Sequence, residues 1–265
     1  MLRLRIITAL LIGLPLIGML FFLPPMLVTG LFALVVLLGA WEWTSLLRWQ
    51  LVWQRCIYVT LLGVAMALVW WCLRSPVYLP MLLYTALLWW VLVLLWIVFF
   101  PQQQSVWLTA LAGVLTLVPA WICISSLLLL DPSWLLFMLL LVVCTDIGGF
   151  LFGRRFGHTK LAAQVSPGKT WEGVFGGLLL SMSVAVAGAY WFAQPMKTFL
   201  GVCLLTVMIS IVGDLSESLF KRHAGLKDSG NILPGHGGIL DRIDSITAAA
   251  PMFLYGLIYL GVFVA

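Results

Sequence analysis

Residues 200–222 read LGVCLLTVMISIVGDLSESLFKR, a run of apolar and small side chains that ends at the carboxylate of Asp214. About 20 apolar residues let an α-helix cross the hydrocarbon core of a membrane, and a single segment in lipid satisfies its backbone hydrogen bonds only as a helix. A charged side chain near the bilayer is costly unless it is paired, hydrated or bound to a cation. The stretch therefore predicts a membrane-spanning helix, and it makes Asp214 a candidate functional residue.

The rest of the chain is equally apolar. Of its 265 residues, 63% are hydrophobic and 9% are charged, and the mean hydropathy is +1.15. Soluble domains carry about 25% charged residues, so this composition excludes a soluble globular enzyme as well as a disordered or collagen-like chain. We expect an all-α, polytopic integral membrane protein that forms a single membrane domain over residues 1–265. The expected transmembrane helices, about nine in number, span residues 6–23, 26–46, 54–73, 78–99, 107–129, 133–153, 173–193, 197–218 and 245–264.

Positive charge is distributed unevenly between alternate connections of these helices. Of the 14 Lys and Arg residues, Arg74 and Lys197 lie on one side of the membrane, and the other 12 lie on the opposite side. Cytoplasmic loops retain an excess of Lys and Arg. The distribution therefore predicts that the N-terminus and the basic loops, which would hold the active site, are cytoplasmic. The expected location is the cytoplasmic (inner) membrane.

Most of the ionisable residues lie between residues 145 and 245. This region holds seven of the nine carboxylates and nine of the 14 Lys and Arg residues. We therefore expect residues 1–144 to form a mainly hydrophobic scaffold and residues 145–245 to form the catalytic region with two cytoplasmic loops. Residues 245–265 are expected to form the last membrane span.

Several polar side chains are predicted to share one face of the helix that carries Asp214. At 100° per residue, Ser218 and Lys221 fall within about 60° of Asp214, with Glu217 alongside. This face then presents a carboxylate, a hydroxyl and an ammonium group. The alternative interpretation is a helix end that emerges into water with a solvated polar stripe.

Two more carboxylates follow where the chain returns to the membrane. Asp241 and Asp244 are three residues apart at the start of the last span, so both can face one side of a helix. With Asp214 they would form a group of three carboxylates, and carboxylate and phosphate oxygens together suit Mg²⁺. The alternative is that Asp241 caps its helix and pairs with Arg242 or Lys227.

The connection between these two helices has a composition suited to phosphate. Residues 221–245 read KRHAGLKDSGNILPGHGGILDRIDS. Its Lys and Arg side chains can form charge-assisted hydrogen bonds with phosphate oxygens, and its five glycines let backbone N–H groups approach an anion closely. Among the histidines, His236 is the best candidate for a phosphate contact because it lies between two glycines.

The other basic loop, residues 153–172, reads GRRFGHTKLAAQVSPGKTWE. Its end is like that of a P-loop, but Ala163 occupies the position of the required upstream glycine and no soluble strand precedes it, so we reject a P-loop. The basic residues suit a polyphosphate or an anionic lipid head group, and an ordinary positively charged loop is the alternative. Asp146, inside the sixth predicted span, needs a partner, for which Lys160 and Arg154 are candidates.

Taken together, these motifs resemble a known enzyme family. In this sequence they are Asp146 followed by Gly148-Gly149, the segment SPGKTWEG at 166–173, Ser218-Leu-Phe-Lys221-Arg222, Lys227-Asp228-Ser-Gly, Pro234-Gly-His236-Gly-Gly and Asp241-Arg242-Ile-Asp244. The set closely resembles the signature of the phosphatidate cytidylyltransferases, also called CDP-diacylglycerol synthases. The resemblance covers residues 146–173 and 213–245.

The resemblance implies transfer of a cytidylyl group from CTP to phosphatidic acid, which releases pyrophosphate and forms CDP-diacylglycerol for phospholipid synthesis. The partners are then CTP, phosphatidic acid and membrane lipids, with no nucleic acid, and a homodimer is left open. Mg²⁺ is the implied cofactor, with Asp214 and Asp244 as metal ligands, and a second, monovalent cation such as K⁺ is left open. The expected catalytic residues are Asp214, Asp241, Asp244 and Lys221. The expected substrate-binding residues are Asp146, Lys160, Ser166, Lys169, Glu172, Ser218, Arg222, Lys227, Asp228, His236 and Arg242.

Three other classes of membrane protein explain less of the sequence. A transporter or channel accounts for Asp146 and Asp214 as parts of an ion pathway, but not for the loop rich in glycine and lysine between Asp214 and Asp244. A CDP-alcohol phosphotransferase carries its aspartates in one compact Asp-Gly…Ala-Arg…Gly…Asp helix pair, and that spacing is missing here. A purely structural subunit needs no clustered carboxylates.

Overall fold

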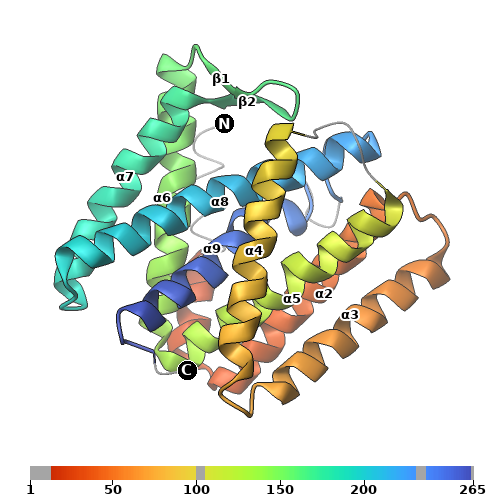
Figure 1. Ribbon diagram of the computed structural model, residues 1–265, viewed down its shortest axis with the longest axis horizontal. Coiled ribbons are helices and arrows are strands. Elements are labelled where there is room, and N and C mark those ends of the chain that lie inside the picture. The colour runs from red at the N-terminus through yellow and green to blue at the C-terminus, as the bar shows by residue number, and fades with distance from the viewer. Residues whose placement is uncertain (1–12, 100–104, 231–236, 264–265) are drawn as a thin grey trace.

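The computed structural model describes residues 13–99, 105–230 and 237–263, and these residues form a helical bundle with one small β-hairpin (Figure 1). A short helix, Gly13–Phe22, precedes the longer elements. In chain order these are α2 (Pro25–Leu46), α3 (Val52–Cys72), α4 (Tyr78–Phe99), α5 (Val106–Leu130), α6 (Pro132–Phe156), β1 (Lys160–Ala162), β2 (Ser166–Thr170), α7 (Trp171–Trp191), α8 (Met196–Ala224) and α9 (Leu240–Tyr259).

This architecture confirms the predicted all-α membrane fold of about nine helices. The seven helices α2 to α8 are long and apolar enough to cross a membrane. Two helices differ from their predicted bounds at the polar region of the chain: α8 continues to Ala224 rather than ending at residue 218, and α9 begins at Leu240 rather than at residue 245. Helix α8 is therefore longer than predicted, whereas α9 has the predicted length but begins earlier, so that it includes Asp241 and Asp244.

Local sequence signals explain where several helices begin and end. Asp131 caps the start of α6, because its side chain accepts a hydrogen bond of 2.7 Å from the backbone N–H of Ser133. The side chain of Thr170 does the same at α7, where it accepts a hydrogen bond from the N–H of Gly173 at 3.1 Å. Gly225 ends α8 in the left-handed conformation, with φ of 74°, which a glycine adopts without a steric penalty.

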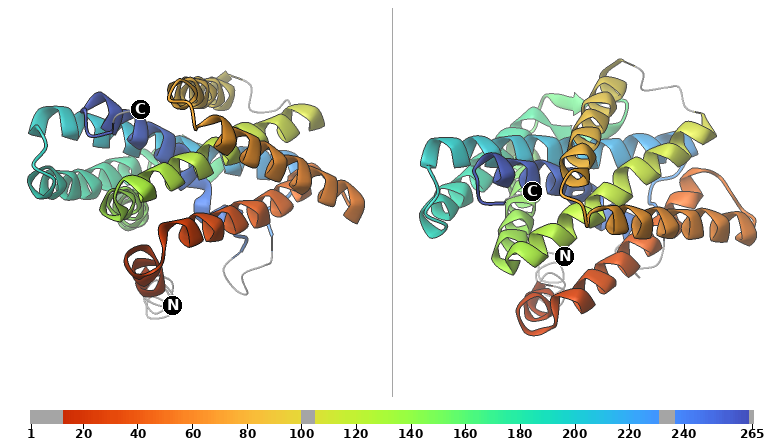
Figure 2. Two further views of the ribbon diagram at one scale, coloured as in Figure 1. Left: turned by 90° about the horizontal axis from the view of Figure 1, so that it is seen from below. Right: turned by 60° about the horizontal axis from the view of Figure 1, so that its bottom comes forward.

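The centre of the bundle is formed by α5 and α9. Helix α9 packs against α8 and α5, and both α5 and α9 bury most of their side chains, whereas α3 buries few. Figure 2 shows α3 at one edge of the bundle and the helix Gly13–Phe22 beside the start of α2. The predicted last span is therefore an interior helix. Within the described part of the chain it is also not one of the seven long apolar candidates for membrane spans.

Glycines bring two helix pairs unusually close together. In the α6–α7 pair, a methyl group on Gly148 would collide with the backbone of Gly176 and Gly177. In the α8–α9 pair, a methyl group on Gly213 would lie 2.7 Å from the carbonyl oxygen of Asp244. Small residues permit such approach between membrane helices. The second contact places the backbone of Asp244 directly beside the residue that precedes Asp214.

The connection between α6 and α7 contains a β-hairpin that the sequence analysis described only as a loop. Strands β1 and β2 are antiparallel, with Lys160 opposite Thr170 and Ala162 opposite Ser166. The hairpin lies at one end of the α6–α7 pair (Figure 1). Because β2 runs directly into α7, the strand fixes where Lys169 lies relative to the helix.

We predict that Gly148→Ala destabilises the protein by about 1–3 kcal/mol, because the added methyl group forces α6 and α7 apart. The measurement is the apparent melting temperature in detergent. Gly149→Ala is the matched control: its methyl group would meet the carbonyl oxygen of Gly173 at 3.7 Å, an ordinary van der Waals distance. This variant should melt no lower than the wild type, because alanine is the better helix former. Equal loss in both variants would contradict the proposed close contact.

Candidate functional site

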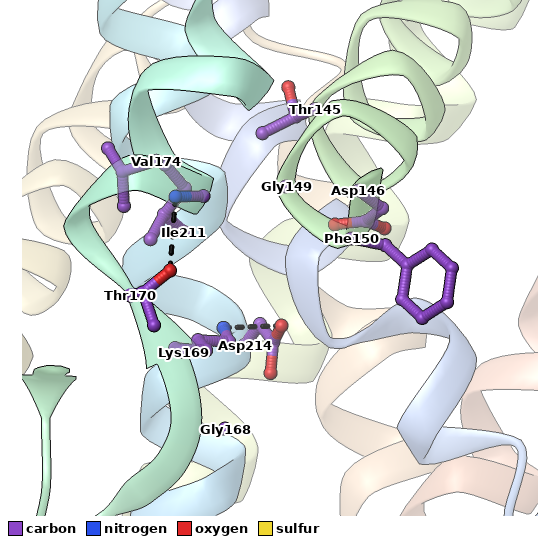
Figure 3. A pocket seen from close by; sticks show the side chains of 11 residues that line it. Thr145, Asp146, Gly149, Phe150, Gly168, Lys169, Thr170, Val174, Ile211 and Asp214 are labelled. Atoms are coloured by element: carbon purple, nitrogen blue, oxygen red, sulfur yellow. Dashed lines mark hydrogen bonds and ion pairs between the residues drawn. The ribbon is translucent and has the colours of Figure 1, made fainter. Parts of the chain in front are cut away.

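A cavity of about 280 Å³ opens between α6, β2, α7 and α8 (Figure 3). Its walls combine small residues with charged ones. It is lined by Thr145, Asp146, Gly149, Phe150, Gly168, Lys169, Thr170, Gly173, Val174, Ile211 and Asp214. Three of the predicted site residues, Asp146, Lys169 and Asp214, are thus brought together from segments that are up to 68 residues apart in the sequence.

Lys169 and Asp214 form an ion pair across this cavity (Figure 3). Their side chains keep 25% and 30% of their surface exposed, so a ligand in the cavity can reach both groups. Lys169 reaches Asp214 because β2 ends beside α8, and Asp214 faces the cavity from the same turn of α8 that contacts α9. The pair combines a phosphate-binding cation with a metal-binding carboxylate.

Two further carboxylates lie close enough to this ion pair to interact with it electrostatically. Asp244, on the first turns of α9, interacts electrostatically with Asp214, Lys169 and Asp146. Asp146, on α6, interacts with Asp214, Lys169 and Arg242. The suggestion that Lys160 or Arg154 neutralises Asp146 is therefore wrong. Lys160 is exposed at the start of β1, and the guanidinium of Arg154 lies over the ring of Phe150, 5.9 Å from its centroid.

Carboxylate oxygens outnumber cations around the cavity, and this donor set fits a divalent cation. Within residues 13–99, 105–230 and 237–263, no group of three or more His, Cys, Asp or Glu side chains is close enough to hold a metal ion alone. Mg²⁺ does not need such a group, since one or two carboxylates, water and substrate phosphates are its usual ligands. Asp214 and Asp244 can supply these two carboxylates.

Lys221 lies at the centre of a second cluster, about two helical turns beyond Asp214 on α8. Its Nζ lies 3.2 Å from Oε1 of Glu217 and 2.5 Å from Oδ1 of Asp241. Glu217 is only 2% exposed. The alternative of a solvated polar stripe on α8 is therefore wrong for Glu217, because the end of α8 is covered rather than open to water.

Asp241 does not join Asp214 and Asp244 in one group of three carboxylates, contrary to the expectation from its spacing. Its Oδ2 accepts hydrogen bonds from the backbone N–H groups of Gly238, at 2.8 Å, and Ser229, at 3.2 Å. The Asp241 carboxylate therefore points toward the connection between α8 and α9, because these two amides and the ammonium group of Lys221 donate hydrogen bonds to it. The alternative interpretation, in which Asp241 caps its own helix, is correct in that its carboxylate accepts the N–H of Gly238. The cation that pairs with Asp241 is Lys221, however, and not Arg242 or Lys227.

The structure also adds one residue that the sequence analysis missed, Glu42 of α2. Glu42 is 2% exposed, and its Oε2 accepts hydrogen bonds from the N–H of Leu240 at 2.8 Å and from Oγ of Ser229 at 3.3 Å. The available signal was a carboxylate within an apolar span, near its C-terminal end, and such a carboxylate is a candidate functional group by default. It lay in the region interpreted as scaffold.

The other predicted residues lie around these two clusters. Arg222 donates from Nε to the carbonyl oxygen of Val165, at 3.4 Å, and so connects α8 to the hairpin. Glu172 accepts the backbone N–H of Thr159, at 3.1 Å, so its carboxylate holds the start of the hairpin. The remaining residues are Ser166 and Ser218, which are half-buried, and Lys160, Lys227, Asp228 and Arg242, which are exposed. His236 lies outside the described residues.

Comparison with known proteins identifies relatives over nearly the whole chain. A family model described as the cytidylyltransferase family matches residues 3–260. A phosphatidate cytidylyltransferase of Pseudomonas aeruginosa is 41% identical over 266 residues, covering 96% of each chain. One of Haemophilus influenzae is 37% identical over 284 residues, covering 96% of this chain and 98% of its own. One of Staphylococcus aureus is 48% identical over 121 residues, about 45% of each chain.

The family match and the two full-length relatives each cover nearly the whole chain. We conclude that this chain belongs to the cytidylyltransferase family.

Proposed function

We propose that this protein transfers a cytidylyl group from CTP to phosphatidic acid, forming CDP-diacylglycerol and pyrophosphate. The relatives from Pseudomonas aeruginosa and Haemophilus influenzae are both named phosphatidate cytidylyltransferases. The observation that carries the proposal is the cavity in which Lys169 pairs with Asp214 beside Asp146 and Asp244. It offers a cation for phosphate and carboxylates for a metal on helices of an integral membrane protein, where a lipid substrate is available.

In the proposed reaction, an oxygen of the lipid phosphate attacks the α-phosphorus of CTP. The bond from the α-phosphorus to the oxygen that bridges it to the β-phosphate breaks, and pyrophosphate leaves with that electron pair. No covalent bond to the protein forms, so catalysis rests on positioning and on stabilising charge. Lys169 binds phosphate oxygens in this scheme, and Lys221 and Arg222 contact phosphate from the end of α8.

The cofactor in this proposal is Mg²⁺, which Asp214 and Asp244 would hold. Bound there, it would neutralise charge on the phosphate oxygens. Asp146 adds negative charge near this position, and Lys169 shields Asp214 when no substrate is present. A second, monovalent cation such as K⁺ would fit the same excess of carboxylates. Asp241 acts by holding Lys221 and the loop amides rather than as a third metal ligand.

The proposed location is the cytoplasmic membrane, with the N-terminus, the hairpin and the loop after α8 on the cytoplasmic side. The distribution of Lys and Arg supports this orientation. CTP would then arrive from the cytoplasm, and phosphatidic acid would arrive from the membrane. Membership of an enzyme family argues against the transporter and the structural subunit as alternatives.

The direct test is release of pyrophosphate by the purified protein in mixed micelles. We expect release only when CTP, phosphatidic acid and Mg²⁺ are all present, and we expect ATP not to replace CTP. Removal of the divalent metal with EDTA should stop turnover, and added Mg²⁺ should restore it. Release without phosphatidic acid, or equal release from ATP, would contradict the proposed reaction.

We predict that Asp214→Asn lowers turnover about 100-fold or more, because the neutral amide is a poor metal ligand and leaves Lys169 without its anion. The melting temperature should change little, since Asp214 is partly exposed. Asp131→Asn is the control, because Asp131 caps α6 away from the cavity. Normal turnover in Asp214→Asn would remove Asp214 from the mechanism.

The two lysines should respond differently to substitution by methionine. The pair of Lys169 with Asp214 is partly exposed and contributes roughly 0–1 kcal/mol to stability, so Lys169→Met should lose turnover but not stability. The side chains of Lys221, Glu217 and Asp241 are 13%, 3% and 12% exposed. Loss of the cation from such a buried pair costs about 3–5 kcal/mol, so Lys221→Met should melt earlier as well. Thermal unfolding and turnover measured on both variants test the contrast.

A further inference from the structure

Glu42 is a buried carboxylate of α2 that contacts the connection between α8 and α9, which lies in the other half of the sequence. Its partners are 187 and 198 residues away: Oγ of Ser229 on one side of the loop and the backbone N–H of Leu240 on the other. No ion pair to Glu42 occurs within the residues that the structure describes. Two hydrogen-bond donors therefore stabilise this anion, and both belong to the segment that connects α8 to α9.

Glycines let this segment approach the carboxylate. A methyl group on Gly230 would collide with Oε1 of Glu42, and one on Gly238 would collide with Oε2 and with Oγ of Ser229. The backbone on both sides of the loop is thus packed directly onto one side chain. Such contact requires glycine at both positions, because any Cβ would occupy the place of the carboxylate oxygens.

The contact also suits the electrostatics of α9. Leu240 is the first residue of this helix, and its N–H is one of the amides that a helix leaves without an internal partner. A negative charge at a helix N-terminus is favoured by the partial positive charge there. Glu42 therefore acts on α9 as a capping group supplied by another helix.

We infer that Glu42 is a positioning residue for the catalytic region. It holds both ends of the loop against α2, and it shares that task with Asp241. Ser229 connects the two carboxylates, because its N–H donates to Asp241 and its hydroxyl donates to Glu42. Asp241 in turn holds Lys221. The effect on turnover rests on the proposed function, whereas the effect on the loop does not.

Trypsin can report directly on the loop. Lys227 is exposed just before Ser229, and cleavage after it requires the neighbouring backbone to leave its native conformation. In Glu42→Ala, two buried donors lose their acceptor. Loss of about 1 kcal/mol from local stability increases the open population about fivefold. We therefore expect cleavage after Lys227 to become at least fivefold faster. The cleavage rate is measured on the full-length protein in detergent, with mass spectrometry to identify the fragments.

Two more variants make the test specific. Glu42→Gln keeps the size of the side chain and one acceptor oxygen but removes the charge, so its cleavage rate should lie between those of the wild type and Glu42→Ala. Asp131→Ala removes another carboxylate that accepts an amide N–H at a helix start, but at α6. It should leave cleavage after Lys227 at the wild-type rate.

Pyrophosphate release from the same preparations provides the second readout. We expect Glu42→Gln to lower turnover at least tenfold while Asp131→Ala retains it. Wild-type cleavage and turnover in both Glu42 variants would overturn the inference, and so would equal acceleration of cleavage in Asp131→Ala. If the wild type itself releases no pyrophosphate, the proposed function fails, but the cleavage rates still decide whether Glu42 holds the loop.

Discussion

Carboxylates inside a membrane protein need cations or hydrogen-bond donors, because desolvation of an unpaired ion costs several kcal/mol. This constraint accounts for the contacts of the buried and partly buried carboxylates. Asp214 is paired with Lys169, and Glu217 and Asp241 share Lys221. Glu42, with no cation beside it in the described residues, is placed against the start of α9. Lys169 with Asp214, Lys221 with Asp241, and Glu42 with Leu240 each join two different elements of the fold, so neutralising the charges also assembles the site.

Close helix packing makes these pairings possible. Lys169 reaches α8 because the hairpin is attached to the closely packed α6–α7 pair, and Asp244 lies beside Asp214 because α9 contacts α8 at Gly213. The apolar segments and the polar site are therefore not independent parts. The glycines that lack side chains set the distances at which the charged side chains meet.

The sequence predicted the helices well, because a segment of 20 or more apolar residues has no other stable conformation in lipid. The family resemblance named Asp146, Lys169 and Asp214 as site residues, but it did not predict that Lys169 pairs with Asp214. The sequence did not predict the hairpin, since the short strands β1 and β2 have no marked alternation of polar and apolar residues. The direction of the Asp241 carboxylate depends on amides of a folded loop, which helical spacing cannot reveal. Glu42 escaped notice because its partners lie 187 and 198 residues away in the sequence.

That separation has a consequence for biosynthesis. Leu240 follows Glu42 by 198 residues, and at translation rates of about 5–20 residues per second the ribosome needs roughly 10–40 s to make the intervening chain. During this interval α2 enters the bilayer with an acidic side chain whose amide partner does not yet exist. The insertion machinery, water or a bound proton has to satisfy that group in the meantime. The hydrogen bond between Glu42 and the start of α9 can form only after that helix has been made.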